Sequence, residues 1–448
     1  MIKPCFTYAE WGKEYGDLIH FTRFGRHYLV INSLEAANDI LERQARLTSD
    51  RPVHTELDQI ATMERGLAMA SYGDGWRIYR RLMHENFRAE ASIDYRPIEI
   101  KHVQKFLDGI DSSEMSLKDQ VSTLSQVIML DSVYGVEISS NKGDMPQHAR
   151  DLVELNDSLF IPGWGAFKSI PFIHLLPSWF PGGRHRVTHE KLSKVMEVVA
   201  ENLWGTMKAM ESDESHSSLM AKLMSEKRPQ ERSSGDIELI KNMGMQAIGA
   251  AADTTMSAIC TFFLAMSLYS DVQRKAQQEL DTVIGHGKIP TFDDRSSLPY
   301  IDAVYREVMR WHPAVPLGLP HVSTEDIYYK NYYIPKGTAI SANIWAMTHD
   351  ESQFGKPDQF IPERHLNKKN NINSILAYGF GRRVCVGRYM ANDTIWITIA
   401  SILATKNISS LPNENVEDYF SDGGFCSTKS LDCKVTSRPR PRASDRDQ

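Results

Sequence analysis

The chain is 448 residues long, 42% hydrophobic and 24% charged, so it can bury a large core as one large domain or as two to three small ones. Its net charge of −6 at pH 7 gives no overall attraction to nucleic acid or to an anionic membrane surface. Five cysteines are an odd number spread along a long chain, which argues against a disulfide framework and favours a reducing, intracellular compartment. Cys426 and Cys433 could pair, but reduced thiols are favoured. The segment Met1–Cys5 lacks the features of a signal peptide, and we find no run of about 20 apolar residues that predicts a transmembrane helix.

The first quarter of the chain is expected to mix helices and strands. A helix is predicted over residues 8–15, and residues 18–24 and 26–31 alternate in the manner of a hairpin that turns at Gly25. Residues 33–46 have the periodicity of an amphipathic helix.

Helices dominate the next part of the chain, roughly residues 74–310. A proline-rich loop at 161–183 interrupts them. Its segment 172–183 contains four large apolar side chains, Leu175, Leu176, Trp179 and Phe180. Two interpretations of this patch remain open: local core packing, or contact with a bilayer interface, where tryptophan is favoured.

A long helix is expected over residues 236–270, because this window contains no proline. At 1.5 Å per residue it would span about 50 Å and cross the whole domain. The charged segment 225–235 before it is typical of a solvated linker, and a second helix is predicted over residues 272–284. At the other end of the chain, the polar tail 437–448 is expected to be frayed.

Two pairs of helical side chains have ordinary explanations when taken alone. Trp76 and Arg80 lie four residues apart on one helix face, which is usually a packed or solvated face. Glu307 and Arg310 lie three apart and can pair bidentately, but such pairs are common on surfaces and contribute little there. Arg364 follows about fifty residues later in the segment Phe360–Arg364.

The long predicted helix contains a run of small residues, Ala250–Thr255. Its three alanines leave a groove on one face, next to the acid of Asp253. The Thr254 hydroxyl can donate a hydrogen bond to the carbonyl of Ala250, four residues back, and so loosen the helix. Taken alone, the run is also typical of an ordinary close-packed helix crossing.

Cys385 lies in the glycine-rich run YGFGRRVCVG at residues 378–387. Three glycines let the backbone turn tightly and approach a flat object closely. Arg382 and Arg383, together with the start of an apolar helix predicted over residues 390–404, are expected to favour a thiolate. A thiolate is a soft ligand that suits iron. The alternative is a structural cysteine in a turn.

The cysteine run resembles the haem-ligand loop of the cytochrome P-450 superfamily, Phe-x-x-Gly-x-Arg-x-Cys-x-Gly, with Tyr378 in place of the phenylalanine. The run Ala250–Thr255 is similar to the family's oxygen-activation motif, with Ala251 in place of the usual glycine. Both motifs occur in the family's order along the chain. The resemblance covers essentially the whole chain, and some segments look like those of fungal members.

The resemblance gives roles to the remaining candidates. Glu307 and Arg310 match the Glu-x-x-Arg element, and Arg364, after Pro362, resembles the family's following element of a proline and an arginine. The acid and two arginines of these elements form a buried network that locks the fold around the haem loop. The implied cofactor is haem b, with Cys385 as the iron ligand. The residues implied to contact haem are Trp76, Arg80, His321, Arg383 and Gly387. For His321, an ordinary loop histidine is an equally good interpretation.

The implied fold is mainly α with small β-sheets, one large domain of residues 1–448 with a long central helix crossing the haem. The implied reaction is a monooxygenation, in which Asp253 and Thr254 relay protons to O2 and one oxygen atom enters a small apolar substrate. Fungal secondary metabolism is the implied setting. Pocket residues would come from the loop before Trp76 and from three other segments, 245–249, 315–319 and 423–425.

Electrons would come from NADPH through a separate flavoprotein reductase. It would dock on the cysteine side, where five arginines supply positive charge: Arg77, Arg80, Arg81, Arg382 and Arg388. Members of this type usually begin with a membrane anchor, whereas this sequence opens at the first predicted helix; either the protein naturally lacks the anchor or the sequence is a shortened form. We therefore expect an anchored form at the surface of the endoplasmic reticulum membrane, or a soluble protein for the chain as it stands, with peripheral contact through 172–183.

Two rival functions remain open. A haem-thiolate isomerase or dehydratase would need neither O2 nor a reductase, although the pair Asp253 and Thr254 argues against it. An inactive haem-binding form would explain the missing anchor, but all the motifs are retained.

Overall fold

The computed structural model describes most of the chain. The described residues are 3–23, 25–52, 66–136, 194, 197–205, 207, 218–225, 233–366, 374–410, 420–421 and 425–439. The predicted loop 161–183, most of the linker 225–235 and the end of the tail lie outside them. Among the described residues helices predominate and the strands form three small sheets, which confirms the predicted fold class.

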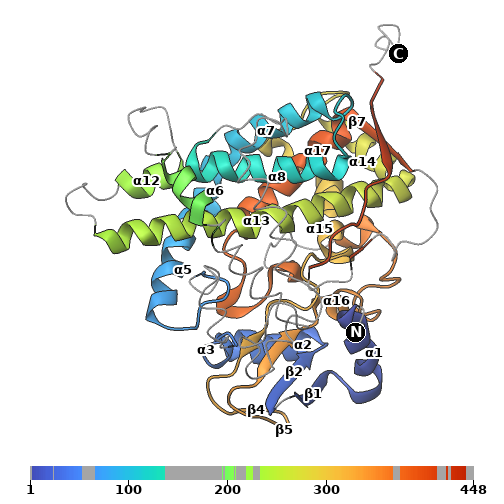
Figure 1. The fold of residues 1–448 in the computed structure, drawn as a ribbon. Helices are drawn as coiled ribbons and strands as arrows, with labels where there is room; N and C mark the ends of the chain where they lie inside the picture. Colours follow the sequence, from blue (N-terminus) through green and yellow to red (C-terminus); the bar gives the residue numbers. More distant parts are fainter. Residues whose placement is uncertain are drawn as a thin grey trace, which may run out of the picture.

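One lobe of the molecule is built on a four-stranded sheet (Figure 1). Helix α1 (Pro4–Tyr15) leads into the antiparallel hairpin of β1 (Leu18–Arg23) and β2 (Arg26–Ile31), in which Leu18 lies opposite Ile31. Strand β6 (Ala339–Ala342) runs parallel to β2, and β3 (His321–Val322) pairs antiparallel with β6. The sheet thereby brings His321 close to the amino-terminal part of the chain.

The other two sheets are hairpin-like pairs. Strands β4 (Ile327–Tyr329) and β5 (Tyr332–Ile334) pair at the tip of the sheet lobe (Figure 1). Strand β7 (Lys406–Ser410) pairs with β8 (Cys433–Ser437) near the carboxyl terminus. Because Ser437 belongs to β8, the predicted frayed tail begins later than residue 437, and residues 440–448 lie outside the described part.

The helices form the second, larger lobe. Besides α1, the α-helices among the described residues are α2 (Leu34–Ala37), α3 (Ala45–Thr48), α5 (Asp74–Phe87), α6 (Ala89–Ser92), α7 (Arg96–Gly109), α8 (Leu117–Tyr134), α12 (Leu219–Ser225), α13 (Ser234–Leu268), α14 (Ser270–Val283), α15 (Pro299–Trp311), α16 (Ile344–Thr348) and α17 (Arg388–Thr405). Short 3-10 helices occur at 93–95, 292–297, 362–365, 376–378 and 381–383. One buried core lies among the helices and a second lies within the sheet lobe.

The helix predicted over residues 33–46 is interrupted. Helix α2 gives way to a π-helical turn, Asn38–Arg43, before α3 begins. The cysteine loop packs against this widened turn, because the Gly381 N–H donates to the Glu42 carboxylate at 2.6 Å. A contact over more than 300 residues of sequence therefore accompanies a local irregularity that the periodicity did not predict.

Helix α13 crosses the whole width of the helical lobe (Figure 1). Ser233 and Asp236 form a capping box that fixes its start, and the helix packs against α8 and α17. Among the described residues, Gly235–Leu268 is the helix long and apolar enough to span a membrane, but 72% of its apolar window is buried in the protein. It is therefore the buried core helix of this fold.

Candidate active site

The cysteine loop is held by its own backbone and by two glycines with positive φ. The Cys385 N–H donates to the carbonyl of Tyr378 at 2.8 Å. Gly379 and Gly381 have φ of +78° and +60°, which L side chains rarely adopt. Helix α17 begins at Arg388, so the sulfur lies beside a helix N-terminus as predicted.

Two glycines of the run have different surroundings. A Cβ atom on Gly381 would lie 2.2 Å from the carbonyl oxygen of Leu41, so glycine is needed for the loop to dock on the π-helical turn. A Cβ atom on Gly387 would meet no atom within 4 Å. The backbone at Gly387 therefore borders open space next to Cys385.

The sulfur of Cys385 faces an internal space. Its side chain is exposed, yet the surrounding protein is dense enough that desolvation is the main influence on the thiol and raises its pKa. The N–H of Gly387 and the charges of Arg80 and Arg388 act in the opposite direction. An accessible sulfur deep within the protein is what a ligand to a buried prosthetic group requires.

The predicted role of the two arginines before Cys385 needs correction. Arg382 donates to the Tyr72 hydroxyl, and neither Arg382 nor Arg383 is among the groups that shift the Cys385 pKa. Burial is the larger influence and raises that pKa, so the structure gives these two arginines no part in favouring a thiolate. Arg80 and Arg388 are the cations that act on the sulfur.

Arg383 donates to three backbone carbonyls. Its Nε donates to Ser49 O at 2.7 Å, Nη1 to Leu67 O at 2.9 Å and Nη2 to Ala70 O at 2.6 Å. The guanidinium also lies 4.5 Å from the Trp76 ring centroid. Burial lowers the Arg383 pKa to about 10. Two of its five N–H groups remain for a further acceptor.

Two more nitrogen-bearing side chains lie near Arg383, the cation of Arg51 and the imidazole of His321. Arg51 is 4% exposed and donates to the carbonyls of Ala68 and Leu319, each at 2.8 Å. Its pKa falls to about 9, because it is buried and close to Arg383. His321, also buried, bonds through Nδ1 to Thr48 O at 2.7 Å, and burial with the Arg51 charge lowers its pKa to about 3.

Trp76 and Arg80 differ in how well they fit their implied role. The Trp76 indole N–H already donates to Leu67 O at 3.0 Å, so the structure gives it a backbone partner in place of a propionate. Arg80 makes no hydrogen bond or ion pair with any residue that the structure describes, and burial lowers its pKa. A desolvated guanidinium of this kind needs an anion. Arg80 and Arg383 therefore fit the carboxylates of a haem.

An accessible stripe runs along the middle of the otherwise buried helix α13. Gln246, Gly249, Ala250, Asp253 and Thr254 are partly or fully accessible, whereas most of their neighbours are buried. These positions share one helix face, and the stripe therefore borders an internal space.

The oxygen-activation motif has the local bond expected from its sequence. Thr254 Oγ1 donates to Ala250 O at 2.9 Å. On the opposite side, the Ser125 hydroxyl of α8 donates to the carbonyls of Ala251 and Ala252 at 3.1 and 3.0 Å. Extra hydroxyl donors thus contact three successive carbonyls, at the point where the family's motif loosens the helix.

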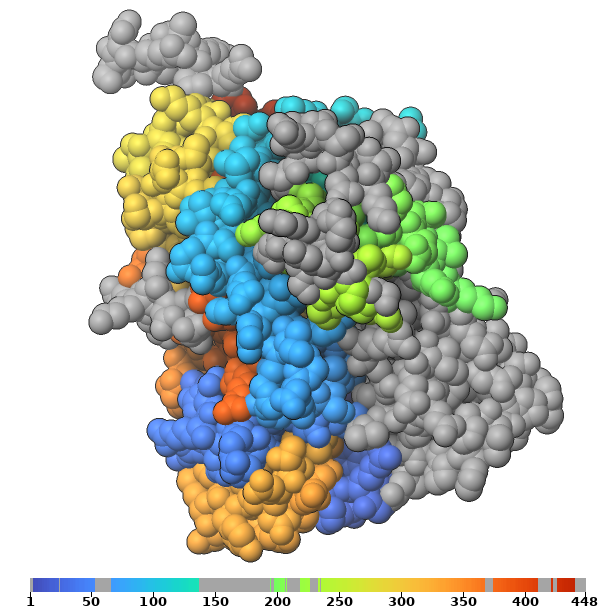
Figure 2. All heavy atoms as spheres, turned by 90° about the vertical axis from the view of Figure 1, so that its left-hand side faces the viewer, coloured from blue at the N-terminus to red at the C-terminus, as the bar shows by residue number. Residues whose placement is uncertain are grey.

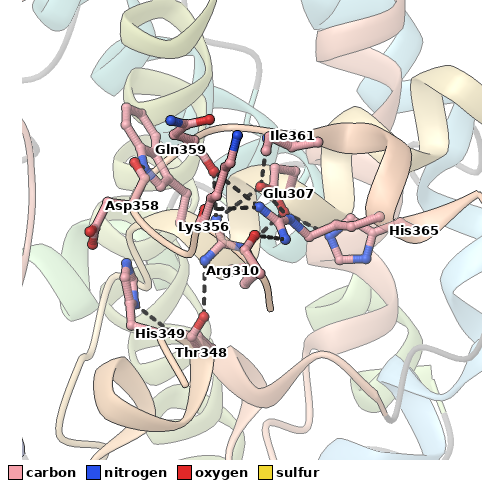
Figure 3. Close-up of polar contacts among 12 residues, drawn as sticks. Glu307, Arg310, Thr348, His349, Lys356, Asp358, Gln359, Ile361 and His365 are labelled. Carbon is pink, nitrogen blue, oxygen red and sulfur yellow. Dashed lines mark hydrogen bonds and ion pairs between the residues drawn. The ribbon is translucent and has the colours of Figure 1, made fainter. Parts of the chain in front are cut away.

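Glu307 is the centre of a buried ion network (Figure 3). Arg310 donates to it twice, at 2.8 and 2.9 Å, Arg364 at 3.1 Å and the Ile361 N–H at 2.8 Å. Glu307 has no exposed surface, and although burial alone would raise its pKa, the bonds from His365 and Arg310 lower the pKa to about 2. The structure therefore brings the three predicted residues together.

His365 is a member of this network that sequence reasoning missed. Its Nε2 lies 2.8 Å from Glu307 Oε2, whereas Ile361 and Arg364 donate to Oε1. The arginines also hold neighbouring segments of the chain, since Arg310 donates to Thr348 O at 2.9 Å (Figure 3) and Arg364 donates to Gly355 O at 2.9 Å. The adjacency of His365 to Arg364 was the one available signal.

Sequence reasoning also missed a tyrosine pair and Arg51. The Tyr378 hydroxyl lies 3.0 Å from the Tyr305 hydroxyl, and both are buried. Tyr378 is the position at which the run departs from the family's phenylalanine, so its extra oxygen links the cysteine loop to α15. The departure itself was the available signal.

Comparisons with known proteins agree with this geometry. The family model described as cytochrome P-450 matches residues 4–432. The cytochrome P-450 monooxygenase claR of Ampulloclitocybe clavipes is 33% identical, over 97% of this chain and 83% of that protein. Cytochrome P-450 monooxygenase COX1 of Coprinopsis cinerea is 34% identical, over 91% of this chain and 81% of that protein.

A solved structure supports the fold. A zebra fish cytochrome P-450, in a structure with progesterone, superposes with a TM-score of 0.80 at 22% identity, over 98% of this chain and all of that one. The chain belongs to the cytochrome P-450 family, whose fungal relatives are monooxygenases and whose cofactor is haem.

Proposed function

We propose that residues 1–448 form one catalytic domain that inserts an oxygen atom of O2 into a C–H or double bond of a small apolar molecule. The electrons come from NADPH through a separate flavoprotein reductase. The observation that supports this proposal is the accessible Cys385, close to Arg80, whose guanidinium makes no hydrogen bond or ion pair with a residue that the structure describes.

Haem b would be held by residues of this chain at three kinds of contact. Cys385 would supply the sulfur ligand to iron, Gly387 would leave room for a flat ring, and Arg80 and Arg383 would neutralise the propionates. His321 bonds through Nδ1 to a carbonyl, so it contacts a propionate only after its other nitrogen is protonated. When bound, haem supplies the redox and oxygen chemistry of the reaction.

Asp253 and Thr254 have the positions required of proton-carrying groups. Both lie on the accessible stripe of α13, and the Thr254 hydroxyl keeps lone pairs with which to accept a hydrogen bond while donating to Ala250 O. We propose that Asp253 passes protons from the protein interior and that Thr254 holds them beside the reacting oxygen.

The proposed docking surface for the reductase lies on and beside α5. Arg77 and Arg81 are exposed on this helix, and Figure 2 shows orange-red atoms, from about residues 380–400, at the surface beside it. Arg382 and Arg388 belong to that part of the chain. We propose that this face attracts an acidic surface of the reductase. Arg80, in contrast, is partly buried and acts on the cofactor.

The proposed substrate is an apolar small molecule of fungal secondary metabolism. Residues 245–249 and 315–319 carry mostly apolar side chains, and the two fungal relatives are monooxygenases by name. The protein works at the endoplasmic reticulum membrane surface, with segment 172–183, which lies outside the described residues, as the proposed contact.

Turnover with and without electrons tests the proposal. The purified haem protein is mixed with a fungal NADPH-dependent reductase and a panel of terpenoid and aromatic substrates, and substrate-dependent NADPH oxidation is followed. Oxygenated product that requires NADPH, O2 and reductase supports the monooxygenase. Product from a peroxide substrate without reductase would instead establish the isomerase, and no product from any substrate would favour an inactive haem protein.

A further inference from the structure

A glutamine on α13 reaches across to a separate part of the chain. The Leu67 N–H donates to Gln246 Oε1. Gln246 lies four residues before Ala250, one turn from the oxygen-activation motif, and belongs to the same accessible stripe. The side chain thus ties the backbone at Leu67 to the helix face that borders the internal space.

The carbonyls of the same segment bind the residues implied to hold haem. Leu67 O accepts from the Trp76 indole at 3.0 Å and from Arg383 Nη1 at 2.9 Å. Ala70 O accepts from Arg383 Nη2 at 2.6 Å, and Ala68 O accepts from Arg51 Nε at 2.8 Å. Residues 66–70 are therefore clamped between α13, α5, the cysteine loop and Arg51.

These bonds have little local support. Within the segment, the Met69 and Ala70 N–H groups both donate to Gly66 O, which makes a single turn. Leu67 is 9% exposed and packs into the core among the helices. A buried N–H that loses its acceptor is costly, so the bond to Gln246 ties Leu67 to α13, while Trp76 and Arg383 hold its carbonyl.

We propose that Gln246 is a positioning residue that holds Leu67 as a wall of the substrate pocket and thereby limits the size of the apolar molecules admitted. It acts through the 66–70 segment, where it accepts a hydrogen bond from the Leu67 N–H. The size limit rests on the proposed function, because it requires the internal space next to α13 to be the substrate pocket.

Three variants of the holoprotein separate this role from general destabilisation. Gln246→Leu removes the acceptor, whereas Gln246→Glu keeps an acceptor oxygen at the same place. Gln273→Leu is the matched control. Gln273 also bonds a backbone, with Oε1 accepting from Ile408 N at 2.7 Å and Nε2 donating to Ile408 O at 2.8 Å, but it lies on α14 and staples β7.

The first readout is hydrogen exchange of peptides covering residues 66–72. We expect exchange about tenfold faster in Gln246→Leu, because a buried amide has lost its partner. Gln246→Glu and Gln273→Leu should exchange there like the parent. Unchanged exchange in Gln246→Leu, or equal acceleration in Gln273→Leu, overturns the clamp.

The second readout is the ratio of dissociation constants for two probes, imidazole and 4-phenylimidazole, from their spectral shifts. We expect Gln246→Leu to shift this ratio about tenfold towards the larger probe, with Gln246→Glu and Gln273→Leu unchanged. An unchanged ratio overturns the size limit. A protein that carries no haem would refute the proposed function and with it the size limit, whereas hydrogen exchange would still decide the clamp.

Discussion

Replacement of Glu307 by glutamine should remove much of the stability of the fold around the cysteine loop. The carboxylate has no exposed surface and accepts five hydrogen bonds, three from arginines, one from a backbone N–H and one from a histidine. Glutamine has the same shape, but it leaves Arg310 and Arg364 without an anionic partner.

Two independent arguments give the magnitude. Loss of one partner of a buried ion pair costs about 3 to 5 kcal/mol. Separately, the pKa of Glu307 is lowered from 4.5 to about 2, and at about 1.4 kcal/mol per pKa unit this corresponds to about 3 kcal/mol. Because the folded-state pKa is the lower one, this stability is fully present above pH 4.5 and is lost as the pH falls towards 2.

The assay is urea unfolding at pH 7, followed by circular dichroism for the chain and by Soret absorbance for haem loss, because the two need not coincide. We expect Glu307→Gln to lose about 3 kcal/mol and to release haem first. The control is Glu363→Gln, the same chemical change in a partly exposed carboxylate paired with Lys275, which should cost under about 1 kcal/mol. A Glu307→Gln protein as stable as the Glu363→Gln protein would refute the reasoning.

Three further predictions concern the loop and the central helix. Gly381→Ala adds a Cβ clash to an unfavourable φ, so it should cost on the order of 3 kcal/mol of stability and most of the bound haem. Gly379→Ala has a similar φ but open surroundings, so it should cost only about 1 to 2 kcal/mol. Equal haem content in the two purified variants would contradict this. Thr254→Ala should keep haem and stability but divert electrons to peroxide, and unchanged coupling of NADPH to product would remove Thr254 from the proton relay. Tyr378→Phe should cost about 1 to 3 kcal/mol by leaving the buried Tyr305 hydroxyl unpaired, and the double variant with Tyr305→Phe should recover part of that loss in thermal unfolding, while additive losses would argue against the hydrogen bond.

The periodicity of the sequence was sufficient for the long elements. The helix predicted over 236–270 is α13 at Ser234–Leu268, and the apolar run 390–404 is α17 at Arg388–Thr405. Both are long, and each is buried over most of its length, so the apolar pattern leaves little choice. The amino-terminal hairpin 18–31 was also predicted correctly, because apolar and polar residues alternate along two segments that Gly25 separates.

Interruptions of the pattern came from distant contacts. The amphipathic pattern of residues 33–46 contains no signal for the π-helical turn at Asn38–Arg43. Gly381 packs against that turn although it lies more than 300 residues away in the sequence. Local propensity does not encode such a contact. Conversely, the glycine at 381 was visible in the sequence, but its close approach to Leu41 was not.

The site was predicted as a set of residue types more completely than as a set of contacts. The acid and two arginines around Glu307 meet as the motifs implied. The indole N–H of Trp76, however, donates to the carbonyl of Leu67. That carbonyl is buried and needs a hydrogen-bond donor. The bond from Leu67 to Gln246 and the position of Arg51 beside Leu319 join residues that are far apart in the sequence. A single sequence contains no signal that pairs such residues.

The most direct test of the account is the carbon monoxide difference spectrum of the dithionite-reduced protein, beside that of Cys385→Ala. A Soret band shifted to the red in the parent and absent in the variant is the expected result, because only a thiolate ligand to haem iron gives that shift. Bound haem that lacks the shifted band in the parent, or shows it equally in Cys385→Ala, would contradict the assignment of Cys385 as the iron ligand.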